Sequence, residues 1–170
     1  MSFLLWLEST RIATFIRESV SFLAYPTFTT AHTLGMGIIV GVSTVVALRL
    51  LGFAPTIPLA PLQKLFPTMW FGFALNLLSG TGMTMAGASH LVPHPLWIAK
   101  MTCVLAAVAV LRVLQVRVFR DPEVGTKPLD TRSKVLAGSL LGLWLLGMIT
   151  GRLIAYTYTE LILQGQAAVR

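Results

Sequence analysis

Three residues with ionisable side chains lie within long apolar stretches of this 170-residue chain: His32, Lys100 and Arg152. A neutral imidazole can ligate a metal, hydrogen-bond a quinone oxygen or relay a proton. The two basic side chains need compensation, because an ionised group at the centre of a bilayer costs about 2.5–3.5 kcal/mol. All six carboxylates lie outside the apolar stretches: Glu8, Glu18, Asp121, Glu123, Asp130 and Glu160. We therefore expect the compensation from lipid phosphates, from backbone carbonyls, or from a bound ligand that is anionic or rich in acceptors.

These residues are the basis of a predicted cofactor site in the outer half of the protein. Haem b held between two histidines needs a second histidine at the same depth, and the segments expected to span the membrane contain only His32. Haem would therefore use His32 with a methionine, a lysine or an open position, and its propionates would meet Lys100 and Arg152. A quinone is the alternative ligand. The full predicted set is His32, Lys100, Arg152, Thr84 and Asn76. Snorkelling of the two cations and an interhelical hydrogen bond of Asn76 are the simpler interpretations.

The same region also allows a metal site. His32, Met36, Met83 and Met85 form a set of soft ligands, which is the type that selects Cu(I). Methionine is also an ordinary filler of hydrophobic cores, so packing is the competing interpretation of these residues.

Other chemistry has little support in the sequence. It contains no P-loop, dinucleotide-binding fingerprint, nucleophile elbow, HExxH motif or paired carboxylates in the apolar stretches. The single cysteine, Cys103, excludes an internal disulfide and a CxxC metal site. The basic segment 120–134 has no aromatic residues between its charges, so we expect no nucleic-acid binding. We also expect no catalytic activity of the chain's own.

The composition indicates a membrane protein. Hydrophobic residues make up 55% of the chain and charged residues 11%, with a mean hydropathy of +0.79, whereas a soluble domain is about 25% charged. Residues 19–48 and 65–99 contain no Asp, Glu, Lys or Arg, and each stretch exceeds the roughly 20 residues of a spanning helix. We predict an all-α integral membrane four-helix bundle. Its expected spans are residues 27–51, 65–88, 95–118 and 133–158.

Charge and glycine spacing refine this prediction. Residues 1–18 are expected to form an amphipathic interfacial helix on the outer leaflet, and residues 19–170 the four-span bundle. The first and third connections are rich in Lys and Arg whereas the second has none, which places both termini in the periplasm of a bacterial inner membrane. Paired glycines predict close helix packing: Gly37 with Gly41, Gly138 with Gly142, and Gly147 with Gly151.

A set of motifs resembles a known family. Along residues 3–156 the chain contains, in order, WLESTRIATFIRES, YPTFTTAHTLGMGIIVG, LRLLGF, LFPTMWFGFALNLLSGTG, PLWIAK and GRLIAY. These segments resemble an uncharacterised bacterial family of four-helix membrane domains of unknown function, which is distantly similar to copper-resistance protein D. The most specific pieces contain His32, Arg49, Lys100 and Arg152. The resemblance implies a four-helix membrane fold, while the activity of the family is itself unsettled.

A wider group of similar bundles includes cytochrome b561-like proteins and the haem-binding membrane protoporphyrinogen oxidases. These use histidine and lysine in their spans, which implies haem or quinone near His32 and Lys100. Many members of the closer family have an acid shortly before the RLLG motif, whereas Ala47 and Leu48 stand there in this chain. A role that depends on that carboxylate is not expected here.

These observations predict a small membrane subunit or anchor of a bacterial electron-transfer complex. Its outer polar layer would hold haem b or a quinone. A copper-binding or copper-transport protein is one alternative, and a purely structural accessory subunit is another. The expected partners are the lipid bilayer and other membrane subunits.

Overall fold

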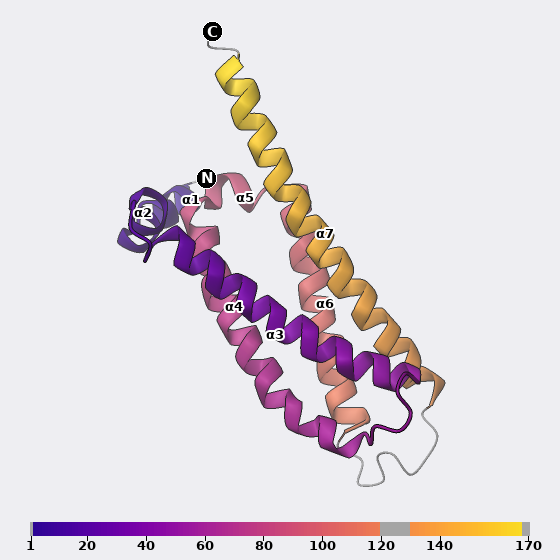
Figure 1. The fold of residues 1–170 in the computed structure, drawn as a ribbon. Helices are drawn as coiled ribbons and strands as arrows, with labels where there is room; N and C mark the ends of the chain where they lie inside the picture. The colour runs from indigo at the N-terminus through magenta and orange to yellow at the C-terminus, as the bar shows by residue number, and fades with distance from the viewer. Residues whose placement is uncertain (1, 120–129, 168–170) are drawn as a thin grey trace.

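The computed structural model describes residues 2–119 and 130–167, and this part of the chain is helical and contains no strand (Figure 1). The predicted all-α class is therefore confirmed. Part of the expected polar third connection, with Asp121 and Glu123, lies outside the described residues. The elements are α1 (Ser2–Glu8), α2 (Arg11–Glu18), α3 (Tyr25–Leu51), the 3-10 helix η1 (Ala60–Leu65), α4 (Phe66–Ala86), α5 (Ala88–Leu91), α6 (Pro95–Arg117) and α7 (Thr131–Ala167).

Three helices are long and apolar enough to cross a membrane. They are α3, α6 and the part of α7 from Thr131 to Thr157, with mean hydropathies of 2.1, 1.9 and 1.5. Helix α4 occupies the expected second span and contains no charged residue, but it is not among the three. Its proline, amide, hydroxyl and glycine residues lower its mean hydropathy. Helix α7 continues to Ala167, beyond the expected end at residue 158, because no proline interrupts its backbone hydrogen bonds.

Prolines and caps set the beginnings and ends of the long helices. Pro26, Pro67 and Pro95 each lie in a first helical turn, where the missing N–H is not needed. The imidazole Nδ1 of His94 accepts a hydrogen bond from the Leu96 N–H at 3.2 Å and so caps α6. Helix α3 ends at Gly52, whose φ of 105° is a left-handed conformation that favours glycine. Helix α6 begins at Pro95, where the sequence predicted the start of the third apolar helix.

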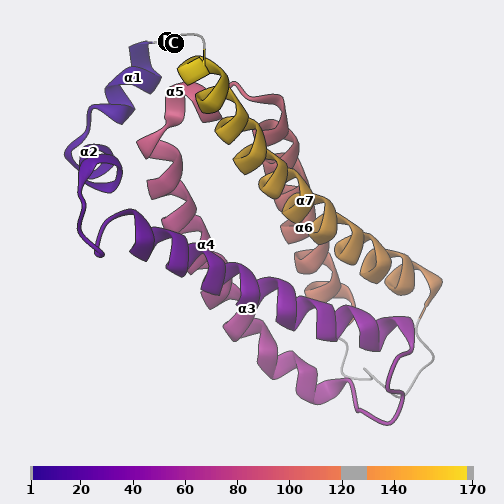
Figure 2. The same cartoon turned by 45° about the horizontal axis from the view of Figure 1, so that its top comes forward.

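The long helices form two antiparallel pairs, α3 with α4 and α6 with α7, and the pairs are joined mainly through α3 and α7. The pairs approach one another at the end where α3 finishes and α7 begins, which we call the convergent end, and they separate toward α5, at the divergent end (Figures 1 and 2). The largest buried side chains mostly belong to the convergent half. Phe66 and Phe119, for example, meet there edge to face with their ring centroids 5.0 Å apart.

Close packing of α3 against α4 depends on two glycines that the sequence pattern did not single out. A Cβ atom on Gly35 would lie 2.6 Å from the backbone nitrogen of Asn76 and 2.8 Å from the carbonyl oxygen of Gly72. A Cβ atom on Gly72 would lie 2.7 Å from the side chain of Ile38. The two backbones therefore touch at this crossing, as small residues permit in membrane helices.

The predicted glycine pairs are only partly correct. Gly147 and Gly151 do face α6, as expected. The expectation is wrong for two pairs that face open space: Gly37 with Gly41, and Gly138 with Gly142. The reason is helical phase, because a residue two positions from a contact residue lies on the other side of the helix.

The N-terminal segment forms two short helices instead of one. Thr10 separates them by capping α2 through a 3.4 Å hydrogen bond from the Ala13 N–H to its hydroxyl. The carboxylate of Glu8 accepts hydrogen bonds from the backbone N–H and the hydroxyl of Ser89, both at 2.7 Å. The Arg17 guanidinium donates to the Ala86 carbonyl at 3.3 Å. Polar bonds thus fasten α1 and α2 to α4 and α5.

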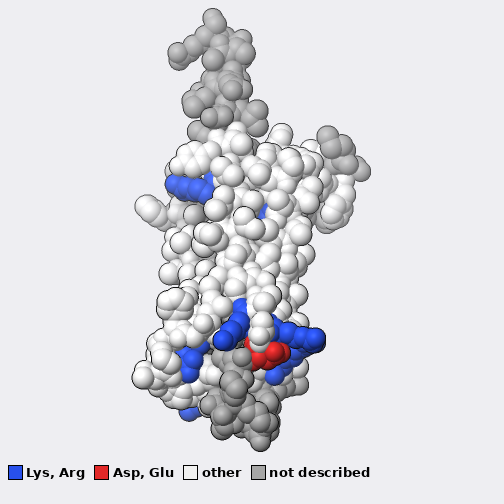
Figure 3. Space-filling model, turned by 90° about the vertical axis from the view of Figure 1, so that its right-hand side faces the viewer, with Lys and Arg blue, Asp and Glu red and all other residues white. Residues whose placement is uncertain are grey.

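Basic residues gather at the convergent end. Figure 3 shows a band of Lys and Arg there, separated by a broad uncharged belt from the few charges near the divergent end. The topology explains the band, because α3 and α6 end there with Arg49 and Arg117, and α7 begins there with Arg132. The two ends of the described chain both lie at the divergent end (Figure 1).

The α3–α4 crossing leads to a prediction with a matched control. Gly35→Ala should destabilise the protein by about 1–3 kcal/mol, because the new methyl group would overlap backbone atoms that cannot move independently. Gly37→Ala, two residues away in open space, should change stability by less than about 0.5 kcal/mol. Thermal unfolding in detergent measures both. Equal effects of the two substitutions would contradict the observed packing.

The Glu8 contact predicts a pH dependence. The hydrogen bonds from the backbone and the hydroxyl of Ser89 lower the pKa of Glu8 below its ordinary value of 4.5. A carboxylate with a depressed pKa stabilises docking above the unfolded-state pKa and loses this effect as the pH falls through the folded-state value. The protection factor of the Ser89 amide, which corrects for the slower intrinsic exchange of amides in acid, should therefore be high at neutral pH and fall as the pH drops through the lowered folded-state pKa of Glu8. Glu8→Gln should remove this acid-induced change, whereas the exposed Glu18→Gln should retain it.

Candidate functional site

His32 of α3 is fixed to α4 by a reciprocal pair of contacts with Asn76. The ring Nδ1 lies 3.1 Å from the Asn76 carbonyl oxygen, and the Asn76 amide Nδ2 donates to the His32 carbonyl at 2.9 Å. Because a carbonyl oxygen only accepts, Nδ1 carries the proton in this bond. In the neutral ring, Nε2 then carries the free electron pair, and no described residue forms a hydrogen bond with it. The imidazole is therefore oriented with one basic nitrogen available.

The surface of α4 beneath the imidazole is shaped by Ser79 and Gly80. A Cβ atom on Gly80 would lie 2.9 Å from the His32 Cε1 and 3.2 Å from Nδ1, so a larger residue would displace the ring. The Ser79 hydroxyl is 3.4 Å from Nδ1 and donates to the Leu75 carbonyl at 2.6 Å. Our sequence reasoning did not single out Ser79. Its spacing of three from Asn76 on a helix was the available signal.

Lys100 is the second predicted residue that the structure brings to this region. Its side chain is half-buried and lies against Gly151 of α7, where a Cβ atom would be 3.4 Å from the Lys100 Cε and 3.6 Å from Nζ. Its charge is close enough to His32 to interact with the imidazole electrostatically. The described residues provide no ion pair for Lys100. The charge of Lys100, which has no carboxylate partner among the described residues, thus acts on the imidazole of His32.

Arg152 is placed differently from the other two. Its side chain is exposed, and its guanidinium carbon lies 5.4 Å from the centre of the Tyr156 ring, one turn further along α7. This geometry is a cation–π contact on one helix. His32 and Lys100 therefore interact through their charges, whereas Arg152 contacts Tyr156 on its own helix.

The other polar residues of the predicted set are engaged or peripheral. The side chain of Asn76 is occupied by the His32 carbonyl, as the interhelical alternative expected. Thr84 is half-buried, one turn beyond Gly80, and its hydroxyl forms no hydrogen bond within the described residues. The Thr81 hydroxyl donates to the Leu77 carbonyl of its own helix at 2.8 Å. The polar layer is accordingly narrower than four contributing helices would make it.

The predicted soft metal ligands lie at different levels of the α3–α4 pair. The contacts of His32 with Gly80 and of Phe28 with Gly82 define the register. At a rise of about 1.5 Å per residue, Met36 and Met83 lie on opposite sides of the imidazole along the bundle. Met85 is further still from the level of the ring. Within the described residues, no group of three His, Cys, Asp or Glu side chains can hold a metal ion.

The comparisons with known proteins add no family assignment. A scan of protein-family models, a search of curated proteins and a search of solved structures found no match to this chain. The resemblance described from the motifs therefore stays a prediction. The functional argument depends on the geometry of His32, Asn76 and Lys100.

Proposed function

We propose that this protein is a small membrane subunit or anchor of an electron-transfer complex that holds haem b at His32 and Lys100. The supporting observation is the hydrogen bond between the His32 Nδ1 and the Asn76 carbonyl oxygen, 3.1 Å apart. Histidines that ligate metals commonly donate their other ring N–H to a carbonyl or carboxylate, which fixes the tautomer and raises ligand basicity. When bound, haem supplies one-electron transfer.

The same tautomer bears on the choice between haem and a quinone. A neutral imidazole that uses its Nδ1 proton on Asn76 offers only an acceptor at Nε2, and a quinone oxygen is also an acceptor. The iron of haem needs the electron pair that Nε2 retains. A quinone remains the alternative ligand through the Lys100 ammonium, which donates three hydrogen bonds.

Lys100 has the chemistry to neutralise an acidic ligand group. It is half-buried and lacks a carboxylate partner in the part of the chain that is described. Haem propionates or an anionic quinone would provide the missing charge. The exposed Arg152 is instead suited to the lipid interface, because long basic side chains reach the headgroups from the ends of spans.

We further propose that α4 is a fourth span. Its 21 uncharged residues correspond to a length of about 30 Å, which is the thickness of the hydrocarbon core. Its backbone touches α3 at Gly35 and Gly72, so that the two helices share one membrane environment. The band of Lys and Arg at the convergent end favours a cytoplasmic location for that end of the bundle. Both termini would then be periplasmic in a bacterial inner membrane.

Helices α1 and α2 have the side-chain distribution of an interfacial segment. Glu8 and Arg17 bond inward to α5 and α4, whereas Trp6, Ile12 and Phe15 are 60%, 58% and 47% exposed. Exposed apolar side chains beside the exposed charges of Arg11 and Glu18 suit the interface between lipid and water. We place these helices at the periplasmic membrane surface.

The direct test is the absorption spectrum of the protein purified with its partners in mild detergent. A Soret band should be present, and His32→Ala should reduce it at least tenfold because the iron loses its nitrogen ligand. His90→Ala is the matched control, because His90 is an exposed histidine in α5. Its spectrum should equal that of the unmodified protein.

Three results would contradict the haem proposal and separate the alternatives. If quinone but no haem can be extracted, and if Lys100→Met weakens quinone binding, the bound ligand is a quinone. Bound copper that disappears after His32→Ala would identify a copper protein. Density between the helices that contains only side chains and lipid would leave a structural accessory subunit.

A further inference from the structure

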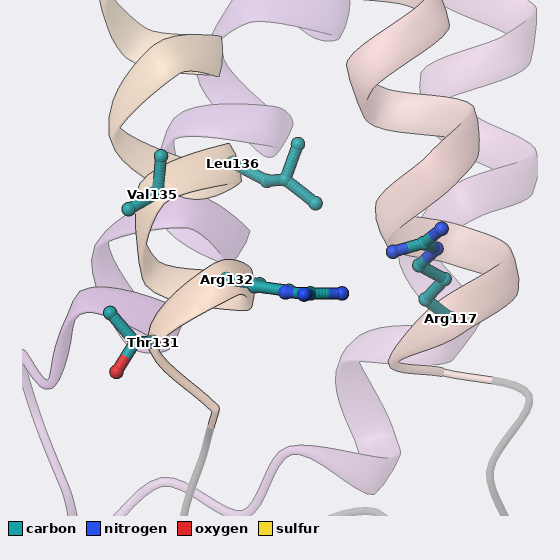
Figure 4. Close-up of a pocket in the computed structure, with 5 residues that line it drawn as sticks. All are labelled: Arg117, Thr131, Arg132, Val135 and Leu136. Atoms are coloured by element: carbon teal, nitrogen blue, oxygen red, sulfur yellow. The ribbon is translucent and has the colours of Figure 1, made fainter.

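Two arginines face one another at the convergent end, far from His32. Arg117 ends α6 and Arg132 begins α7, and Figure 4 shows their side chains extending toward each other across the space between the two helices. With Thr131, Val135 and Leu136 they line a cleft of about 300 Å³. Neither α6 nor α7 contributes a carboxylate to its lining.

The guanidinium groups of Arg117 and Arg132 have no hydrogen-bond or ion-pair partner within the described chain, as is also true of Arg11. Arg49 donates to the Ile57 carbonyl and Arg112 donates to the Gln115 side chain at 2.9 Å. Arg117 and Arg132 form no hydrogen bond or ion pair with any described residue. Asp130, the residue directly before α7, forms no ion pair within 4 Å with either of them. Two facing cations without a partner repel one another unless an anion lies between them.

The other lining residues indicate what kind of anion would fit. The first turn of α7 presents the positive end of the helix dipole, which favours an anion such as phosphate. Val135 is 61% exposed and Leu136 is half-buried, one turn above the arginines. Both helices are long and apolar enough to cross a membrane, so the cleft lies where two spans meet the headgroup region.

We propose that this cleft binds the phosphate group of an anionic phospholipid. The phosphate lies between Arg117 and Arg132, and an acyl chain follows Val135 along α7. An apolar wall that continues from the cationic pair suits a lipid better than free phosphate, which has no apolar part. Basic pockets between spanning helices on the cytoplasmic side are typical sites for anionic headgroups.

The test measures lipid retained by the full-length protein in native mass spectrometry. The probes are phosphatidylglycerol, phosphatidylcholine with the same acyl chains, and inorganic phosphate. The double substitution Arg117→Gln and Arg132→Gln removes both direct guanidinium contacts to the phosphate, so it should weaken phosphatidylglycerol binding on the order of 20-fold. Inorganic phosphate should not displace the lipid.

The matched control removes the same charge outside the cleft, by Arg112→Gln with Lys134→Gln. It should change phosphatidylglycerol binding less than about twofold. An equal loss in control and cleft variants would overturn the proposal, as would equal retention of the two lipids or displacement by inorganic phosphate. If the glutamine variant does not accumulate, Arg117→Lys with Arg132→Lys retains the charge. It should still weaken binding several-fold, because lysine cannot form the paired hydrogen bonds of a guanidinium, and unchanged binding would count against the site.

Discussion

The backbone contact between α3 and α4 at Gly35 and Gly72 is the constraint on which the site depends. A side chain at either position would push the helices apart by the width of a methyl group or more. The close approach brings the His32 carbonyl within 2.9 Å of the Asn76 amide and lays the imidazole over Gly80. The ring has little freedom to turn, because one of its nitrogens is held by the Asn76 carbonyl. A basic nitrogen is thereby preorganised without any charged residue in its immediate contacts.

The uneven packing of the two helix pairs gives each end of the protein a different character. Large apolar side chains such as Phe66 and Leu114 fill the convergent end, where Lys and Arg gather at the surface. The divergent end has fewer buried side chains, and His32 and Lys100 are half-buried there. Helices α1 and α2 cover one side of this end through Glu8 and Arg17. The convergent end is therefore closely packed, whereas the region around His32 and Lys100 at the divergent end has fewer buried side chains.

Much of the fold follows from residue types that act locally. Prolines and the ends of apolar runs predicted the positions of α3, α4 and α6 to within two residues, because both determine where a helix can begin or end. The break between α1 and α2 was missed, since the cap at Thr10 belongs to a segment with continuous helical spacing. The glycine contacts were predicted less well. Spacing identifies a possible face of a helix, but only the three-dimensional register shows that Gly35 meets α4 while Gly37 does not.

The candidate site was likewise predictable only in part. The sequence predicted His32 and Lys100 at a similar depth in the outer half of the bundle, and the charge of Lys100 acts on the imidazole in the structure. Depth does not define direction around a helix, so Arg152 shares the level yet contacts Tyr156 on the exposed side. The partner that orients His32 is a backbone carbonyl, a group present at every residue and therefore invisible to a search for side chains.

The central claim is that His32 is a neutral imidazole protonated on Nδ1 with an available Nε2. Nitrogen-15 NMR of histidine-labelled protein in lipid, with the His32 signals assigned by their loss in His32→Ala, tests this most directly. The account predicts a protonated Nδ1 and an unprotonated Nε2 in the cofactor-free protein. A proton on Nε2 with none on Nδ1, or a doubly protonated ring, would contradict it.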